Sequence, residues 1–206
     1  MTSRTDAQTK RTRMTPEARR EQFLELGMEM LRAHALEDVT TEAIADAAGV
    51  SRALLFHYFE SKQDFHVALA SAQAKAMLER TAPDSTVGDP LEILRVSMSS
   101  FVDFVYGNAG AYRAIIRGSA SADPALQQVF AQTRATMRQR IIDYSEVLGI
   151  EVTPLVVMAV SGWLSFVEEV TLAWLADQGD VDRDQLLGLI TGSLPMLASV
   201  AAAVSN

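Results

Sequence analysis

The chain has 206 residues, of which 49% are hydrophobic and 21% are charged, and it carries a net charge of −8 at pH 7. This length suits one large domain or two small ones, and the composition is that of a folded protein rather than a disordered one. Because the sequence contains no cysteine, disulfides, thiolate nucleophiles and cysteine-ligated zinc are excluded.

The charge is unevenly distributed along the chain. Residues 1–20 carry 6 basic and 2 acidic side chains, whereas residues 81–206 carry 7 basic and 14 acidic ones. We expect residues 1–13 to form a disordered basic tail, while the acidic total argues against indiscriminate nucleic-acid binding. The absence of cysteine favours a cytoplasmic location, and the polar N-terminus lacks the apolar segment of a secretion signal.

Proline marks the start of four predicted helices. In each case a Thr or Asp precedes the proline and can accept a hydrogen bond from an orphan backbone N–H, while proline at the first helical position loses no hydrogen bond. Hydrophobic residues then recur every three or four positions, and no alternating strand pattern of useful length occurs. The chain is therefore predicted to be all-α. The four pairs are Thr15-Pro16, Asp89-Pro90, Asp123-Pro124 and Thr153-Pro154.

Stretches rich in Gly, Asp and Asn predict the connections between these helices. The stretch Thr81–Asp89 is the longest without periodicity in the first half, and we interpret it as the join between an N-terminal module and a larger helical body. The periodic pattern that begins at Leu126 extends to Leu148. The other predicted connections are Gly107–Gly110, Gly118–Asp123, Gly149–Thr153 and Asp177–Asp182.

The segment Pro154–Phe166 is apolar almost all round, yet its 13 residues are fewer than the ~20 needed to cross a bilayer. A helix that is apolar on all sides must be covered on all sides, so we expect a second subunit to cover one flank. Thr153–Ala176 and Asp184–Val200 are predicted to form a four-helix bundle in a homodimer. Pro195 is expected to break or kink the second of these helices.

Residues 39–65 indicate two short helices joined by a tight turn, followed by a third. Thr40 can cap the first helix, which ends at Gly49, where a left-handed conformation suits glycine. Ser51 can cap a second helix over Arg52–Phe59. Val39 and Ile44 form a predicted hydrophobic staple, and Ser61 with Asp64 forms a capping-box-like pair at the start of the third helix. Two short helices joined by such a turn form a helix-turn-helix.

The second helix has an inward and an outward face. Val50, Leu55 and Phe59 fall on the inward face, whereas Arg52 and Phe56 lie outward, where they suit a major groove. Arginine can bond guanine bidentately and phenylalanine can touch a thymine methyl group. The hydroxyls of Tyr58 and Thr41 and the ammonium group of Lys62 could bind phosphates. The candidate DNA-binding residues are Thr41, Ser51, Arg52, Ala53, Phe56, His57, Tyr58 and Lys62.

The stretch Thr41–Lys62, TEAIADAAGVSRALLFHYFESK, closely resembles the helix-turn-helix signature of the TetR/AcrR family of bacterial transcription regulators. The similarity covers residues 15–70, and it implies a recognition helix from Ser51 to Tyr58. It implies a DNA-binding domain over 14–62 and a ligand-binding and dimerisation domain over 63–206. By this resemblance the protein is a homodimeric repressor that leaves a palindromic operator when it binds a small, largely apolar effector.

The sequence departs from the family's pattern on the recognition helix. Ala53, Leu54 and Phe56 stand where members often carry Gly, Thr and Tyr, so we expect a weaker grip on the DNA backbone from this helix. Glu42 lies near the expected DNA surface and would repel phosphate unless it is turned aside.

Aromatic and Met side chains at helical spacing in the C-terminal body suit an apolar pocket with a few polar groups. Gln127 is a further polar candidate. Glu168 and Glu169 diverge by about 100° on a helix, so they cannot jointly flank one bond, and we expect only one to face inward. The candidate ligand-binding residues are Met98, Phe101, Tyr112, Arg113, Ile116, Phe130, Met137, Trp163, Phe166 and Glu168.

Other functions remain open from the sequence. The chain has no Ser-His-Asp arrangement, phosphate loop or metal-ligand spacing, so neither an enzyme nor a cofactor or metal site is predicted. A helical enzyme or small-molecule carrier with a vestigial DNA module is one alternative. A DNA-binding or protein-interaction factor that needs no ligand is another, and a body without a cavity would favour it.

Overall fold

The computed structural model of the protein describes residues 14–34, 36–117, 123–177 and 179–205. Within these ranges every regular element is helical, which confirms the predicted all-α class. The predicted tail over 1–13 and residues 118–122 of the predicted connection Gly118–Asp123 lie outside the described residues. The elements are α1 (Pro16–Leu31), η1 (Leu36–Asp38), α2 (Thr41–Ala47), α3 (Arg52–Phe56), α4 (Lys62–Arg80), η2 (Ser85–Val87), α5 (Pro90–Gly107), α6 (Ala109–Arg117), α7 (Pro124–Asp143), α8 (Pro154–Ala176) and α9 (Arg183–Ser205).

All four predicted proline-marked helix starts are confirmed. In α1, α5, α7 and α8 proline lies in the first turn, and the side chain of the residue before it caps the helix. The Asp123 carboxylate, for example, accepts hydrogen bonds from the N–H groups of Ala125 and Leu126 at 2.8 and 3.1 Å. These contacts satisfy donors that the helix itself leaves free.

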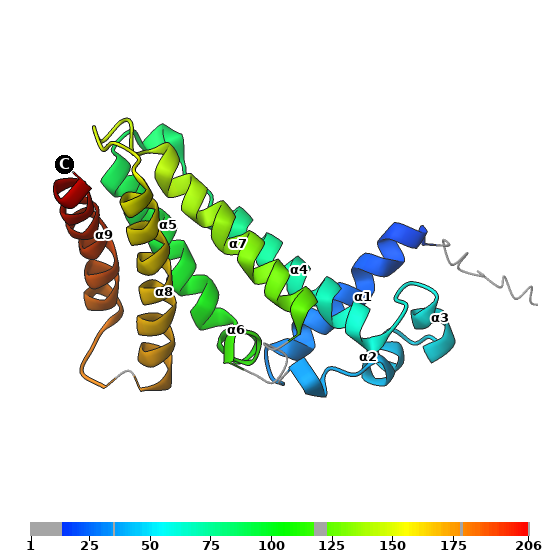
Figure 1. The fold of residues 1–206 in the computed structure, drawn as a ribbon. Coiled ribbons are helices and arrows are strands. Elements are labelled where there is room, and N and C mark those ends of the chain that lie inside the picture. The colour runs from blue at the N-terminus through cyan, green and yellow to red at the C-terminus, as the bar shows by residue number, and fades with distance from the viewer. Residues whose placement is uncertain (1–13, 35, 118–122, 178, 206) are drawn as a thin grey trace, which may run out of the picture.

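The helices α1, α2 and α3 and the first half of α4 form a small head at one end of the molecule (Figure 1). Its core is built from large side chains that are at most 1% exposed: Phe23, Ile44, Leu55, Phe59 and Phe65. Val39 is equally buried in the same cluster, as the predicted staple requires.

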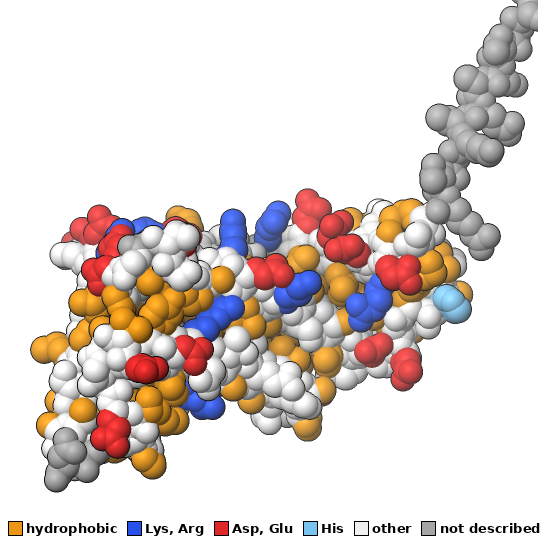
Figure 2. Space-filling view, turned by 90° about the horizontal axis from the view of Figure 1, so that it is seen from above, with side chains coloured by type: hydrophobic (Ala, Val, Ile, Leu, Met, Phe, Trp, Pro, Cys, Tyr) orange, Lys and Arg blue, Asp and Glu red, His pale blue; other side chains and the backbone are white. Residues whose placement is uncertain are grey.

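The second half of α4 and the helices α5 to α9 form a larger body (Figure 1). The pair α8 and α9 packs most extensively, and the fully buried Trp163 joins the two helices because its indole N–H donates to the Ile190 carbonyl at 3.1 Å. Many hydrophobic side chains also gather on the body's surface (Figure 2).

One helix belongs to both cores. Phe65 and Leu69 of α4 are buried in the head, whereas Met77, two to three turns further along, is buried in the body. The predicted boundary between residues 62 and 63 falls at the start of this helix and stays a prediction. The head and the body are joined by an unbroken rod rather than by a flexible linker.

Two predicted helix ends differ from the structure. α3 ends at Phe56 rather than Phe59, because the N–H groups of His57 and Tyr58 bond carbonyls only three residues back and tighten the chain into a turn. α7 ends at Asp143, which leaves Leu148 exposed.

Pro195 is expected to break or kink the helix, and of these two outcomes the break does not occur, since α9 continues through this residue. Leu194 and Ala198 are buried against the body on either side of the proline. Their packing compensates for the ~3 kcal/mol that proline costs inside a helix.

By length and composition, α8 and α9 could each cross a membrane, and α8 extends ten residues beyond the apolar run that ends at Phe166. In this fold, however, 39% of the most apolar window of α8 and 28% of that of α9 is buried. Helices in the core of a soluble protein have the same composition, so these features are weak evidence for a membrane span.

The turn between α2 and α3 depends on Gly49, whose φ is +65°. Replacing it with alanine should destabilise the protein by about 1 kcal/mol, because a Cβ disfavours left-handed backbone. Gly49→Asn is the matched control and should cost less, since Asn tolerates this conformation. Urea unfolding of the two variants measures the difference, and equal stability of the Ala and Asn variants would contradict the explanation.

Candidate functional site

Local hydrogen bonds fix the geometry of the α2–α3 unit. The hydroxyls of Thr40 and Ser51 accept hydrogen bonds from the first turns of α2 and α3, at 3.1 and 3.3 Å. The N–H groups of Gly49 and Val50 bond back to the carbonyls of Asp46 and Ala45 and close the C-terminus of α2. The predicted caps are therefore confirmed, and these hydrogen bonds hold the turn between α2 and α3 in one conformation.

The predicted faces of α3 are largely as expected. Leu55 and Phe59 are buried, whereas Ser51, Arg52, Ala53 and His57 are exposed. Phe56 and Tyr58 are half-buried, and Lys62 is exposed at the start of α4. The Tyr58 ring lies edge-on between Phe23, at 5.6 Å, and His57, at 5.5 Å between ring centroids.

The expectation for Thr41 is wrong, because its side chain does not reach the outer surface. Thr41 is only 2% exposed, and its hydroxyl donates to the Glu42 carboxylate at 3.0 Å. Its position in the first turn of α2 turns the side chain toward the head's core. In this conformation its hydroxyl cannot contact phosphate.

The exposed guanidinium of Arg52 is held by two neighbours. Its Nη1 lies 2.7 Å from the Glu42 carboxylate, and its Cζ lies 5.2 Å from the centroid of the Phe56 ring. A hydrogen bond from the backbone, another from Thr41 and the charges of Arg52 and Lys62 lower the pKa of Glu42. The Glu42 carboxylate is thus turned aside onto Arg52, as it must be if it is not to repel phosphate.

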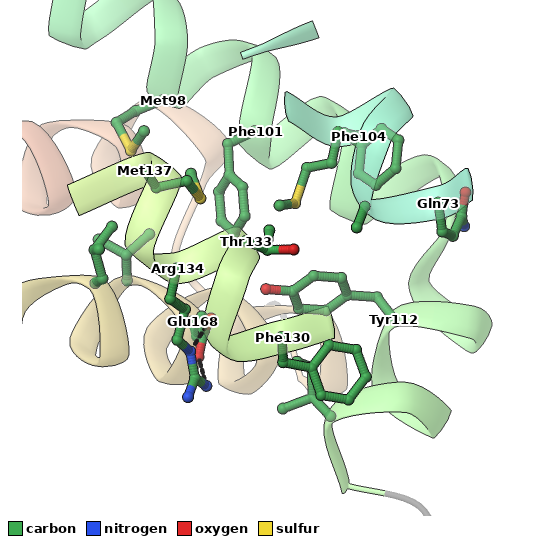
Figure 3. A pocket seen from close by; sticks show the side chains of 15 residues that line it. Gln73, Met98, Phe101, Phe104, Tyr112, Phe130, Thr133, Arg134, Met137 and Glu168 are labelled. Carbon is green, nitrogen blue, oxygen red and sulfur yellow. Dashed lines mark hydrogen bonds and ion pairs between the residues drawn. The ribbon is translucent and has the colours of Figure 1, made fainter. Parts of the chain in front are cut away.

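A central pocket lies in the body between α4, α5, α6, α7 and α8 (Figure 3). It offers about 60 Å³ of space. Seven of the ten predicted ligand residues line it: Met98, Phe101, Tyr112, Ile116, Phe130, Met137 and Glu168.

The other three predicted ligand residues do not line this pocket. Arg113 is exposed, Trp163 is fully buried in the α8–α9 contact, and Phe166 packs against the core without reaching the pocket. Gln127 is also exposed and outside the lining. Helical periodicity finds the buried side of a helix, but it does not tell which buried residues border a cavity.

The sequence reasoning missed several lining residues. Thr133 and Arg134 lie between Phe130 and Met137 at helical spacing on α7, so their position on the same face could have been recognised. Gln73, Ala74 and Met77 come from α4, and only the packing of α4 against α7 brings them to the pocket.

The polar wall of the central pocket is an ion pair. Arg134 Nε donates to Glu168 Oε1 at 3.0 Å, and Arg134 Nη2 donates to the second carboxylate oxygen (Figure 3). The Glu168 side chain is 17% exposed, whereas Glu169 lies on the exposed side of α8. Of Glu168 and Glu169, Glu168 is therefore the one that faces inward, and Arg134 compensates its charge.

The Tyr112 hydroxyl points into the central pocket (Figure 3), and its ring packs edge-on against Phe101 at 6.1 Å between centroids. Burial and, to a smaller extent, the negative charge of Glu168 raise the pKa of the Tyr112 phenol well above its ordinary value. The pocket therefore presents a neutral hydroxyl and apolar walls, a combination that suits a largely apolar molecule.

Comparison with known proteins agrees with this architecture. Residues 23–69 match the family model described as bacterial regulatory proteins, tetR family. The transcriptional activator FasR of Mycolicibacterium smegmatis is 26% identical over 178 residues, which cover 84% of this chain and 79% of FasR.

Solved structures share the fold. A TetR-family transcriptional regulator from Streptomyces coelicolor superposes with a TM-score of 0.82 at 24% identity, covering 93% of this chain and 85% of that one. The fatty acid degradation regulator FadR from Bacillus halodurans gives a TM-score of 0.65 at 16% identity, with coverages of 86% and 97%. Residues 23–69 thus match the tetR family of bacterial regulatory proteins, and the chain shares the fold of a solved TetR-family regulator, with an N-terminal helix-turn-helix and a helical C-terminal body.

The raised pKa of Tyr112 predicts an altered titration. An exposed tyrosine ionises near pH 10, but we expect Tyr112 to keep its proton while the protein is folded. Unfolding then releases a proton above pH 10, so stability should fall as the pH rises further. Absorbance titration of the four tyrosines measures this. The Tyr112→Phe variant should lack the late component, and a wild type whose tyrosines all ionise together near pH 10 would contradict it.

Proposed function

We propose that this regulator binds a near-palindromic operator as a homodimer and is released from it by a small, largely apolar effector, so that it acts as a repressor in the cytoplasm. The observation that supports DNA reading most directly is the division of α3 into a buried face and an exposed face that presents Arg52. In the proposed complex, α3 lies in the major groove.

The proposed base contact requires an exchange of partners. Arg52 and Glu42 are 60% and 50% exposed in their side chains, so water and salt screen their attraction. A guanine edge can take over the guanidinium through two hydrogen bonds. Ser51, Ala53, Phe56 and His57 are proposed to lie along the same groove, with Tyr58, Lys62 and the tail over 1–13 on the phosphates.

The base-reading role of Arg52 can be tested with duplexes selected from a random pool. Arg52→Ala should reduce the preference for the selected over a scrambled duplex by about 1–3 kcal/mol. Arg80→Ala, at the exposed far end of α4, is the control and should leave the preference unchanged. Glu42→Gln removes a negative charge and should strengthen binding to both duplexes.

Fluorescence anisotropy at a fixed salt concentration measures the binding of all three variants to both duplexes. Unaltered discrimination by Arg52→Ala would remove arginine from the proposed readout.

The uncovered face of the α8–α9 pair supports dimerisation. Large apolar side chains on it are between 41% and 72% exposed: Met158, Leu189, Met196, Leu197, Val200 and Val204. Gly162, Ser165 and Ala173 share the exposed side of α8 with Met158 and permit close approach of a second helix. Two copies of this face would form a four-helix bundle, and their two-fold axis would match the symmetry of the operator.

The double substitution Met196→Glu and Val200→Glu should convert the dimer to a monomer, because it would place four carboxylates in the apolar contact of the dimer. Val147→Glu, in the turn after α7 where the valine is 71% exposed, is the control and should stay dimeric. Sedimentation equilibrium measures the mass, and circular dichroism verifies the fold. A monomeric wild type at micromolar concentration would contradict the proposed interface.

Effector binding can reach the head through α4, because this helix lines the central pocket and is buried in the head. An effector that favours a wider separation of the two heads lowers the population that fits DNA. Reversal of occupancy from 99:1 to 1:99 needs about 5.5 kcal/mol of differential binding. The pocket itself favours a ligand-responsive regulator over a ligand-independent factor.

Activation is the second candidate, since FasR is named an activator. A promoter that carries the selected operator distinguishes repression from activation. Its transcription should fall if the protein is a repressor and rise if it is an activator.

A further inference from the structure

The turn between α7 and α8 lies at the end of the body away from α3 (Figure 1). A second cavity lies beside this turn. We call it the distal cavity. It is bordered by α5, the C-terminal end of α7, the following turn, α8 and α9, and it offers about 310 Å³ of space. This space is about the size at which pockets begin to hold small organic ligands, whereas the central pocket with its 60 Å³ is much smaller. Its walls are mostly apolar and include Leu91, Leu94, Ile141, Leu148, Val160 and Leu194.

The distal cavity and the central pocket share two walls. Met98 and Met137 line both, and these side chains separate the two spaces. Methionine is unbranched and has several rotatable bonds, so it adapts its shape at small energetic cost. The two spaces are therefore neighbours, divided by flexible side chains.

The distal cavity contains a single charged side chain, among the described residues that line it, and that side chain is Arg140. Its Nη1 donates to the Leu78 carbonyl at 2.9 Å and lies 3.4 Å from the Thr81 hydroxyl. In the described part of the chain Arg140 forms no ion pair, whereas Arg134 in the central pocket is paired with Glu168. A half-buried guanidinium without a carboxylate, on an apolar wall, is suited to an anion that arrives with an apolar body.

We propose that the distal cavity binds an elongated apolar molecule that carries one oxyanion, with the anion on Arg140 and the chain running toward Met98 and Met137. The neutral Tyr112 phenol and the compensated Arg134–Glu168 pair leave the central pocket without a free charge, so the anionic end belongs in the distal cavity. This orientation also buries the apolar chain where the walls are apolar.

The same arginine connects this ligand to the head, and this step rests on the function proposed above. Leu78 and Thr81 lie at the C-terminal end of α4, where helix carbonyls lack intrahelical partners and a cation stabilises them. A bound oxyanion competes for the guanidinium that binds this helix end. The ligand therefore acts on α4 directly, at the end opposite the helix-turn-helix.

The probes are decanoate and its neutral counterpart 1-decanol, titrated into the full-length protein without DNA by isothermal titration calorimetry. Wild-type protein should bind decanoate about tenfold or more tightly than 1-decanol, since a hydrogen bond to a charged group accounts for a difference of this size. Arg140→Gln should weaken decanoate binding about tenfold and leave 1-decanol binding unchanged. Arg140→Lys should retain part of the preference.

Arg138→Gln is the matched control, because Arg138 lies on the same helix, is half-buried and borders neither cavity. It should bind both probes as the wild type does. Ala198→Leu, which fills part of the distal cavity, should weaken both probes, and thermal melting verifies that each variant is folded.

Equal binding of the two probes by the wild type, no binding of decanoate, or the same effect of Arg140→Gln and Arg138→Gln would each overturn the inference. Operator binding is measured separately with the selected duplex. If only the decanoate titrations fail, the proposed DNA-binding function still stands. If only operator binding fails, the titrations still test the distal cavity.

Discussion

The burial of α4 in two cores at once is the constraint on which the rest of this molecule depends. Phe65 and Leu69 fix its first half among the head helices, and Met77 fixes its second half beside the pocket. A helix held at both ends cannot shift at one end without moving or straining the other, because close-packed side chains transmit displacement. Packing alone thus connects the central pocket to the head through one helix.

Charge compensation distinguishes two kinds of arginine among Arg52, Arg134 and Arg140. Arg52 and Arg134 each lie against a carboxylate, at the reading surface and at the central pocket. Among the described residues, Arg140 donates to neutral oxygens only, one of them a carbonyl at the end of α4. An added anion must displace a carboxylate from a compensated arginine, whereas at Arg140 it competes only with neutral oxygens of the described residues. Arg52 and Arg134 are therefore suited to exchanging one partner for another, whereas Arg140 is suited to binding an added anion.

Most of the fold could be predicted because its signals are local. Proline after a capping residue marks four helix starts, and the buried positions of Leu55 and Phe59 follow from a helical wheel. The errors arise where tertiary packing decides. The burial of Thr41 and the continuity of α9 at Pro195 depend on neighbours that no local pattern specifies.

The short helix α3 separates folding from recognition more sharply than its length suggests. Its contribution to the core comes from Leu55, with Phe59 in the turn beyond it, while Ser51, Arg52, Ala53 and His57 contribute little apolar burial. Exchange of those outward side chains costs the fold little, since surface substitutions usually change stability by less than about 0.5 kcal/mol. In the proposed mode of DNA reading, a few point mutations among these outward side chains would direct a descendant to another promoter while its architecture stayed intact.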